Sequence, residues 1–173
     1  MTILDPHPEH PIALPVPKAI EAVIDLAECV CGMLAAEGAG ETCWCGLYPG
    51  AEVSWEYCGG ECTGDACGMG YVRLALATPY EVFPSPAIDD RCALPMFWAL
   101  EVGALRCLPV PHDGSVLDVG PMAEVAIGQM LDARALRKAI KCCGHPFGLG
   151  AWTPLGPAGA CVGGAWTAYL DMD

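Results

Sequence analysis

The chain has 173 residues with eight basic and 21 acidic side chains, which gives a formal net charge of −13. Apolar residues make up 54% of the chain and charged residues only 17%, so the composition argues against disorder and fits one domain with a sizeable core. Nucleic-acid binding is disfavoured, because neutralising phosphates needs clustered Lys and Arg. The longest apolar runs are far too short to cross a bilayer, so we expect no membrane partner.

The first 17 residues predict an extended, Pro-rich N-terminal arm. Prolines at positions 6, 8, 11, 15 and 17 oppose a helix and favour polyproline-like geometry. The segment lacks the basic and apolar regions of a signal peptide, so we expect a protein that is not secreted. The arm is either a loose terminus or a segment captured by an ordered partner, and residues 18–173 form a single domain.

A first helix is predicted from Lys18 to about Gly38. Pro17 before it and Gly38 at its end match the usual start and stop signals. Its apolar side chains recur every three or four residues and form one stripe, made of Ile20, Val23, Ile24, Ala27, Val30, Cys31 and Leu34.

Three strands are predicted next, at Val53–Tyr57, Tyr71 to about Val82, and Phe97–Leu108. In the second strand Pro79 requires the far end to lie at an edge or to leave the sheet. The alternation places Val72, Leu74 and Leu76 on one face of the second strand, and Trp98, Leu100, Val102 and Ala104 on the inner face of the third. On the third strand we expect Glu101 and Arg106 to tolerate water.

A second helix and two terminal strands complete the predicted domain. The helix runs from Pro121 to about Cys143, with a less regular apolar stripe that permits a break near Asp132. Four cations near its end (Arg134, Arg137, Lys138 and Lys141) fit a solvated helix face rather than a phosphate site.

The last quarter of the chain predicts two strands around a turn. The first ends at Pro154, and Gly156, Pro157 and Gly159 reverse the chain. The second runs from Cys161 to Leu170 with Val162, Gly164, Trp166, Ala168 and Leu170 on one face, and Gly163-Gly164 indicates a bulge or a close neighbour. The complete order predicts an α+β domain with a single mostly antiparallel sheet and two helices packed on it.

The twelve cysteines are the unusual feature, at positions 29, 31, 43, 45, 58, 62, 67, 92, 107, 142, 143 and 161. We expect Cys31, Cys107 and Cys161, which fall on element faces, to be free thiols that pack as small hydrophobic residues. The group from Cys43 to Cys67 stays open between free thiols, disulfides and a metal site. No Cys-x2-Cys knuckle supports structural zinc, and without a secretion signal disulfides are disfavoured.

Residues able to carry catalysis form no recognisable arrangement in the sequence. Cys143 and His145 can be drawn as a nucleophile pair, but at two residues apart in a turn such a pair is usually incidental. The chain has no nucleophile-elbow Ser, His-Glu-x-x-His or P-loop, and Gly68-Met-Gly70 precedes a strand rather than a helix. We therefore assign no catalytic, cofactor-binding or metal-ligating residue, and we expect no cofactor and no enzymatic activity.

Four segments carry a resemblance: Gly150–Pro157, Gly159–Thr167, Leu100–Cys107, and the pair Cys142-Cys143 after a helix. They resemble a family of neck proteins from tailed phages that infect actinobacteria, described as head-to-tail connector or tail terminator proteins. The resemblance runs from about Lys18 to Leu170, is specific in the last quarter and loose in the Cys-rich middle. The order of helices and strands is also similar to that of tail terminators.

The resemblance implies a structural virion protein of the neck, specifically the tail terminator, a hexameric ring that caps the tail tube and joins it to the head. Its partners would be copies of itself, the tail tube protein and the head-completion or stopper protein. Genomic DNA would pass through the lumen without specific binding, because acidic walls repel it. The protein would be in the host cytoplasm during assembly and then in the virion, and any disulfides could form only after leaving the host cell.

Three alternatives remain open at this point. One is a stopper or adaptor protein of the same neck. The others are a Cys-rich zinc-binding module and an enzyme with a Cys nucleophile.

Overall fold

The computed structural model describes residues 18–54, 67–79, 96–109, 119–158 and 160–171 of the chain. Two helices and five strands occur in these ranges, in the order α1 (Lys18–Glu37), β1 (Trp44–Leu47), β2 (Met69–Pro79), β3 (Met96–Cys107), α2 (Val119–Cys142), β4 (Gly148–Ala158) and β5 (Cys161–Asp171). The predicted α+β class and the order of elements are confirmed. The Pro-rich arm lies outside the described residues.

The five strands form one mixed sheet in the order β1-β2-β3-β5-β4. Three neighbouring pairs are antiparallel and only β1 and β2 run parallel. The chain leaves β3, passes through α2 and returns as β4, and β5 then inserts between the two. Because the two central strands β3 and β5 pair along their whole length, they form the rigid middle of the sheet.

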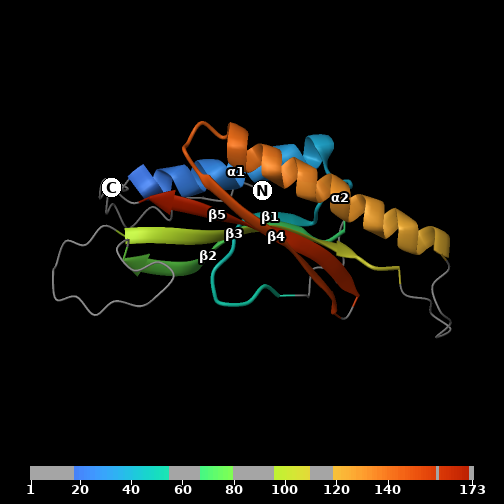
Figure 1. Ribbon diagram of the computed structural model, residues 1–173. Helices are drawn as coiled ribbons and strands as arrows, with labels where there is room; N and C mark the ends of the chain where they lie inside the picture. The colour runs from blue at the N-terminus through green and yellow to red at the C-terminus, as the bar shows by residue number, and fades with distance from the viewer. Residues whose placement is uncertain (1–17, 55–66, 80–95, 110–118, 159, 172–173) are drawn as a thin grey trace, which may run out of the picture.

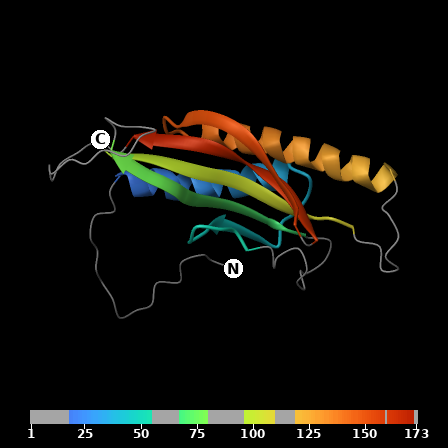
Figure 2. The same cartoon turned by 60° about the horizontal axis from the view of Figure 1, so that its bottom comes forward.

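Both helices lie antiparallel on the same face of the sheet, as Figures 1 and 2 show. Of the predicted stripe on α1, Ala27, Val30 and Leu34 are buried. Leu26, which the stripe left out, is buried with them, whereas Ile20 is 38% exposed. The buried side chains meet Leu136 and Ile140 of α2 and one face of the central strands in the main core. Each fully buried Leu or Ile here contributes about 1.5–3 kcal/mol relative to an exposed one.

The predicted alternation of the central strands is confirmed. On β3, Leu100, Val102 and Ala104 belong to the main core, and on β5 Ala168 and Leu170 join them. The opposite face of the sheet has a smaller second core, formed by Met69, Tyr71, Leu105, Cys161 and Ala165. The sheet is therefore apolar on both faces.

The glycine pair in β5 marks a close neighbour rather than a bulge. The ring of Trp152 on β4 lies so close to Gly164 that a Cβ there would be 2.2 Å from a ring atom. Trp152 also contacts Trp166, with 5.7 Å between ring centroids, and Trp166 donates a hydrogen bond of 2.7 Å to the carbonyl of Ala133 on α2. The Gly residue thus makes room for the aromatic pair that holds the hairpin under α2.

The predicted position of the first strand is wrong. The first strand is Trp44–Leu47, whereas Val53 and Ser54 belong to no strand and residues 55–57 lie outside the described ranges. Arg73 donates hydrogen bonds to the carbonyls of Gly50 and Ala51 and so holds this stretch as a loop across the second core.

The terminal hairpin also differs from its prediction. β4 does not end at Pro154 but continues to Ala158, with a register shift between Leu155 and Ala158 that absorbs a cis Gly156–Pro157 bond. An irregularity of this kind in the edge strand β4 lets it pair with β5 again beyond the shift. Gly159 lies outside the described residues.

On β2 the predicted single face is interrupted. A register shift lies between Leu74 and Leu76, so β2 bulges there, and both side chains are about half exposed. Pro79 lies at an edge as predicted, because β1 pairs with β2 only as far as Val72.

Helix α2 is continuous through Asp132, where a break was considered. Its buried residues begin at Asp132, and the first half of the helix projects past the ends of the strands (Figures 1 and 2). The irregular apolar stripe thus reflects a helix whose fully buried residues all lie in its second half. Within the described ranges, no helix combines the length and apolar character that crossing a membrane requires.

A buried ion pair fixes α2 to the sheet at the point where it departs. The carboxylate of Asp132, which is 2% exposed, accepts two hydrogen bonds of 2.8 Å from the guanidinium of Arg106 on β3 and one from the backbone N–H of Ala39. Arg106 also donates to the carbonyls of Gly40 and Glu41. Arg106 was expected to tolerate water; instead it joins β3, α2 and the segment after α1.

Replacing Asp132 with Ala should destabilise the protein by about 3–5 kcal/mol, because it leaves the largely buried guanidinium of Arg106 without its partner. Urea unfolding under non-reducing conditions, followed by circular dichroism, measures this difference. Glu28→Ala on the exposed side of α1 is the control, and we expect it to change stability by less than about 0.5 kcal/mol. A loss below about 1 kcal/mol for Asp132→Ala would contradict the role given to this pair.

Candidate functional site

Six cysteines of the described ranges are in disulfides, which corrects the expectation of free buried thiols. Cys31 on α1 is bonded to Cys45 on β1, and Cys67 is bonded to Cys107 at the end of β3. Cys43 and Cys161 are disulfide-bonded as well. The sequence predicts free thiols at Cys31, Cys107 and Cys161. The apolar face of a helix or strand indicates that a cysteine is buried, but not which other cysteine it lies against. Cys58 and Cys62 lie outside the described residues.

Three described cysteines keep free thiols: Cys29, Cys142 and Cys143. Burial, the hydrogen bond to Cys29 and the negative charges of Cys29 and Asp25 raise the pKa of Cys143 to about 12. His145 is bonded not to Cys143 but to Asp25 of α1, with 2.7 Å between Nε2 and the carboxylate oxygen. The arrangement keeps Cys143 protonated at neutral pH, whereas a nucleophilic cysteine needs a lowered pKa. Among the described residues, no group of three or more His, Cys, Asp or Glu side chains could hold a metal ion.

Iodoacetamide should alkylate the exposed Cys142 faster than Cys143 at pH 8, because the reagent attacks thiolates and Cys143 remains a thiol until the pH approaches 12. Mass spectrometry of the variants Cys142→Ala and Cys143→Ala gives the rate at the remaining position. The same variants in urea provide the control, since unfolding should equalise the two rates. Faster alkylation of Cys143 in the folded protein would instead favour an enzyme with a Cys nucleophile.

The features left open to other molecules are two apolar surfaces. The first is on the projecting half of α2 and is called here the α2 ridge. Five large apolar side chains form it, Val119, Met122, Ile127, Met130 and Leu131, with exposed fractions of 86%, 46%, 57%, 71% and 37%. They are spread around the helix from residue 119 to residue 131, a stretch whose only charged residue is Glu124. A helix segment that is apolar on several sides is normally buried.

The second surface, called here the α1 groove, lies between the start of α1 and the edge of β2. Its volume is about 320 Å³, and its lining includes Ile20 and Val23 of α1, Leu47 of β1, Leu74 of β2 and Trp98 of β3. Ile20, Leu47 and Leu74 are each more than a third exposed. The groove exists because β1 has four residues and β2 has eleven, so that beyond Val72 the edge of β2 has no partner among the described strands.

On the face of the sheet opposite the helices, a cluster of three polar side chains fixes β2, the strand that forms one side of the groove. The hydroxyl of Tyr71 donates a hydrogen bond of 2.6 Å to Glu101, and Glu101 also pairs with Arg73, the single charged residue in the groove lining. Burial, followed by the hydrogen bond to Glu101, raises the pKa of Tyr71 well above its usual range. Glu101 was expected to tolerate water, but its carboxylate is committed to two neighbours on β2.

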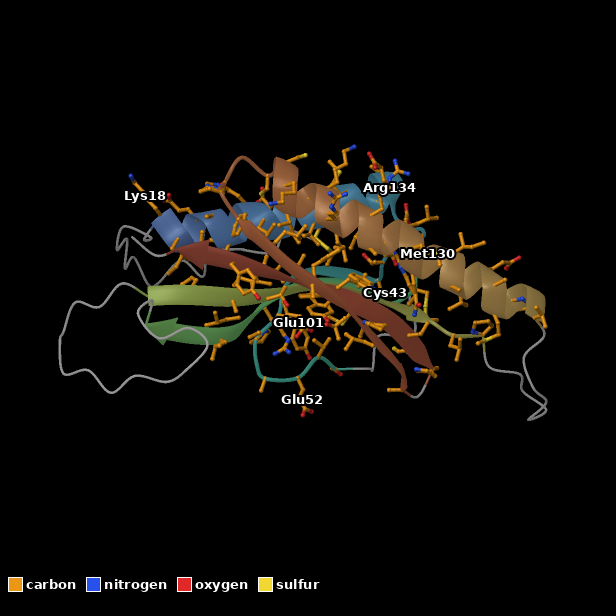
Figure 3. The ribbon with its side chains drawn as sticks, viewed as in Figure 1. Lys18, Cys43, Glu52, Glu101, Met130 and Arg134 are labelled. Carbon is orange, nitrogen blue, oxygen red and sulfur yellow. A yellow bond between two sulfur atoms is a disulfide. The ribbon has the colours of Figure 1, made fainter. Side chains whose placement is uncertain are left out.

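The two surfaces lie at opposite ends of the molecule. In Figure 3, Met130 on α2 is far from Lys18 at the start of α1, the helix whose Ile20 and Val23 line the groove. The periodicity of apolar residues in the sequence could not reveal these two surfaces, because Ile127, Met130 and Leu74 look like ordinary core residues. The available signal in the sequence was the irregular apolar stripe on α2, whereas the bulge on β2 is visible only in the structure.

The four cations near the end of α2 lie partly in ion pairs with α1. Lys138 and Arg134 both contact Glu37, whose pKa is lowered first by the hydrogen bond from Lys138. Arg134 is 75% exposed, and Lys141 donates to the carbonyl of Phe147. These contacts agree with a solvated helix face that also ties the two helices together.

Comparisons with protein-family models, with curated proteins and with solved structures found no match to this chain.

Proposed function

We propose that this protein is a structural component of a tailed-phage neck that works by self-association, specifically the tail terminator, a ring that caps the tail tube and joins it to the head. The observation that supports it is the pair of different apolar surfaces at opposite ends of the molecule. A single contact between two different patches repeats around a closed ring, whereas one self-complementary patch stops at a dimer.

The exposed apolar surfaces and the state of Cys143 are consistent with this proposal. Exposed patches of large apolar side chains on a soluble chain usually mark interaction sites. Cys143 is held in its protonated form by its raised pKa and so is not an activated nucleophile. The specific assignment to the neck, and to the terminator within it, follows from the resemblance of residues 100–107 and 150–167 to the phage family.

The net charge of −13 per copy suits the passage of DNA. A lumen that keeps part of this charge repels phosphates, so that the genome would slide through without binding. The disulfides fit a particle that is completed in the reducing cytoplasm and oxidised after release, where Cys31–Cys45 and Cys67–Cys107 would stabilise an assembled ring. A stopper or adaptor protein of the same neck would share these properties and is the alternative role.

Negative-stain electron microscopy of the purified protein should show rings with an open centre, and mass spectrometry of purified tailed particles should find the chain among their components. Rings that bind duplex DNA tightly at moderate salt would contradict a sliding lumen. The chain's absence from particles, together with full activity of a single subunit on a small molecule, would overturn the proposal.

Elemental analysis separates the proposal from a zinc-binding module. Protein purified without chelators should contain less than about 0.1 zinc per chain, because a structural zinc site would hold one ion per chain with high affinity. The zinc content of the same protein with all twelve cysteines reduced is measured for comparison. Stoichiometric zinc that resists dialysis would favour the Cys-rich module instead.

A further inference from the structure

We propose that the α2 ridge of one copy docks into the α1 groove of the next copy. The inference rests on the proposed function in that it names the contact by which copies join. The geometry points to it because the two surfaces differ in shape: one is a projecting helix and the other is a hollow between a helix and a strand edge.

The ridge presents its apolar residues at the spacing that a helix uses in a groove. Val119, Met122, Ala126 and Met130 are separated by three, four and four residues, so they follow one another along the helix. Ile127 and Leu131 form a second row beside them. Gly120 and Ala123 beside these rows are small and exposed, which allows the helix to approach its partner closely.

The groove accepts side chains of this kind. At about 320 Å³ it lies at the lower end of the 300–1,000 Å³ that proteins use for small ligands, so it suits a few apolar side chains. Ile20, Leu47 and Leu74 form its rim, and Trp98 gives it an aromatic wall. Aromatic side chains in such positions often dominate the energy of an interface.

Charge favours a second copy as the occupant. Two chains of net charge −13 repel each other, so they can meet only where acidic residues are scarce or faced by cations. The ridge carries only the acidic Glu124, and the groove lining contains the single cation Arg73 and no acidic residue. The contact therefore joins the parts of two acidic chains where like charges are scarce.

A contact of the ridge with itself is less favourable on the same grounds. It would bring two Glu124 carboxylates together and would leave both α1 grooves open to water. It would also end at a dimer, because a two-fold contact is closed.

The test uses one charged substitution in each surface, Met130→Asp in the ridge and Leu74→Asp in the groove. Both positions are exposed, so both variants should fold. Analytical ultracentrifugation of each variant alone should show self-association weakened by about 30-fold or more, as for a residue at the centre of an interface. Ala35→Asp, at an exposed site near the end of α1, adds the same charge and should assemble like the unsubstituted protein.

An equimolar mixture of the two variants gives the decisive result. The Leu74→Asp chain keeps its ridge and the Met130→Asp chain keeps its groove, so the mixture should form dimers of one chain of each kind and nothing larger. This dimer also shows that both variants are folded. A mixture that stays monomeric would overturn the inference.

Other outcomes point to other contacts. If the Leu74→Asp variant assembles normally and Met130→Asp does not, the ridge pairs with a surface other than the groove, and the inference is wrong. If deleting residues 1–17 abolishes assembly while both substituted variants still assemble, the arm carries the contact, which also overturns it. Unsubstituted protein that remains monomeric at high concentration overturns this contact as well, whereas the proposed function is judged separately by the presence of the chain in tailed particles.

Discussion

The ion pair between Arg106 and Asp132 determines which part of α2 belongs to the core. It is buried and uses both oxygens of the carboxylate, so α2 cannot slide or tilt at that point without breaking several hydrogen bonds at once. The fully buried residues of α2 begin at Asp132, whereas the residues before it are exposed or only partly covered by the strands. The exposed ridge is therefore a direct consequence of where the anchor lies along the helix.

The second apolar surface has a related origin, because the strands of the sheet differ in length. β2 continues for seven residues past the last residue that pairs with β1, and α1 extends over the same end of the sheet. The unpaired edge of β2 and the side of α1 then enclose a hollow that no described strand fills. The bulge between Leu74 and Leu76 twists this edge, which opposes pairing with a foreign strand and favours occupation by side chains.

Much of the fold could be predicted from periodicity, because α1, β3 and β5 each direct one apolar face into the main core. Strand β1 was missed because its four residues include Cys45 and Gly46 and have no alternation; its position depends on pairing with Met69–Val72 and on the bond from Cys45 to Cys31. The ridge was missed for a different reason. The sequence shows that Ile127 and Met130 are apolar, but whether a partner element lies over them depends on the length of the sheet, which is a tertiary property.

The same contacts that build the fold also make the two surfaces rigid. Packing in the main core holds α1 against β1 and β2, and these elements form walls of the groove. The bond between Cys31 and Cys45, with 5.6 Å between the two Cα atoms, fixes α1 to β1 further once the particle is oxidised. Glu101 holds Arg73 from the other face of the sheet, so the third wall is fixed as well. A groove and a helix that keep their shapes before they meet lose little conformational entropy on binding. An association that depends on few side chains can then be strong enough to unite chains that repel each other by charge.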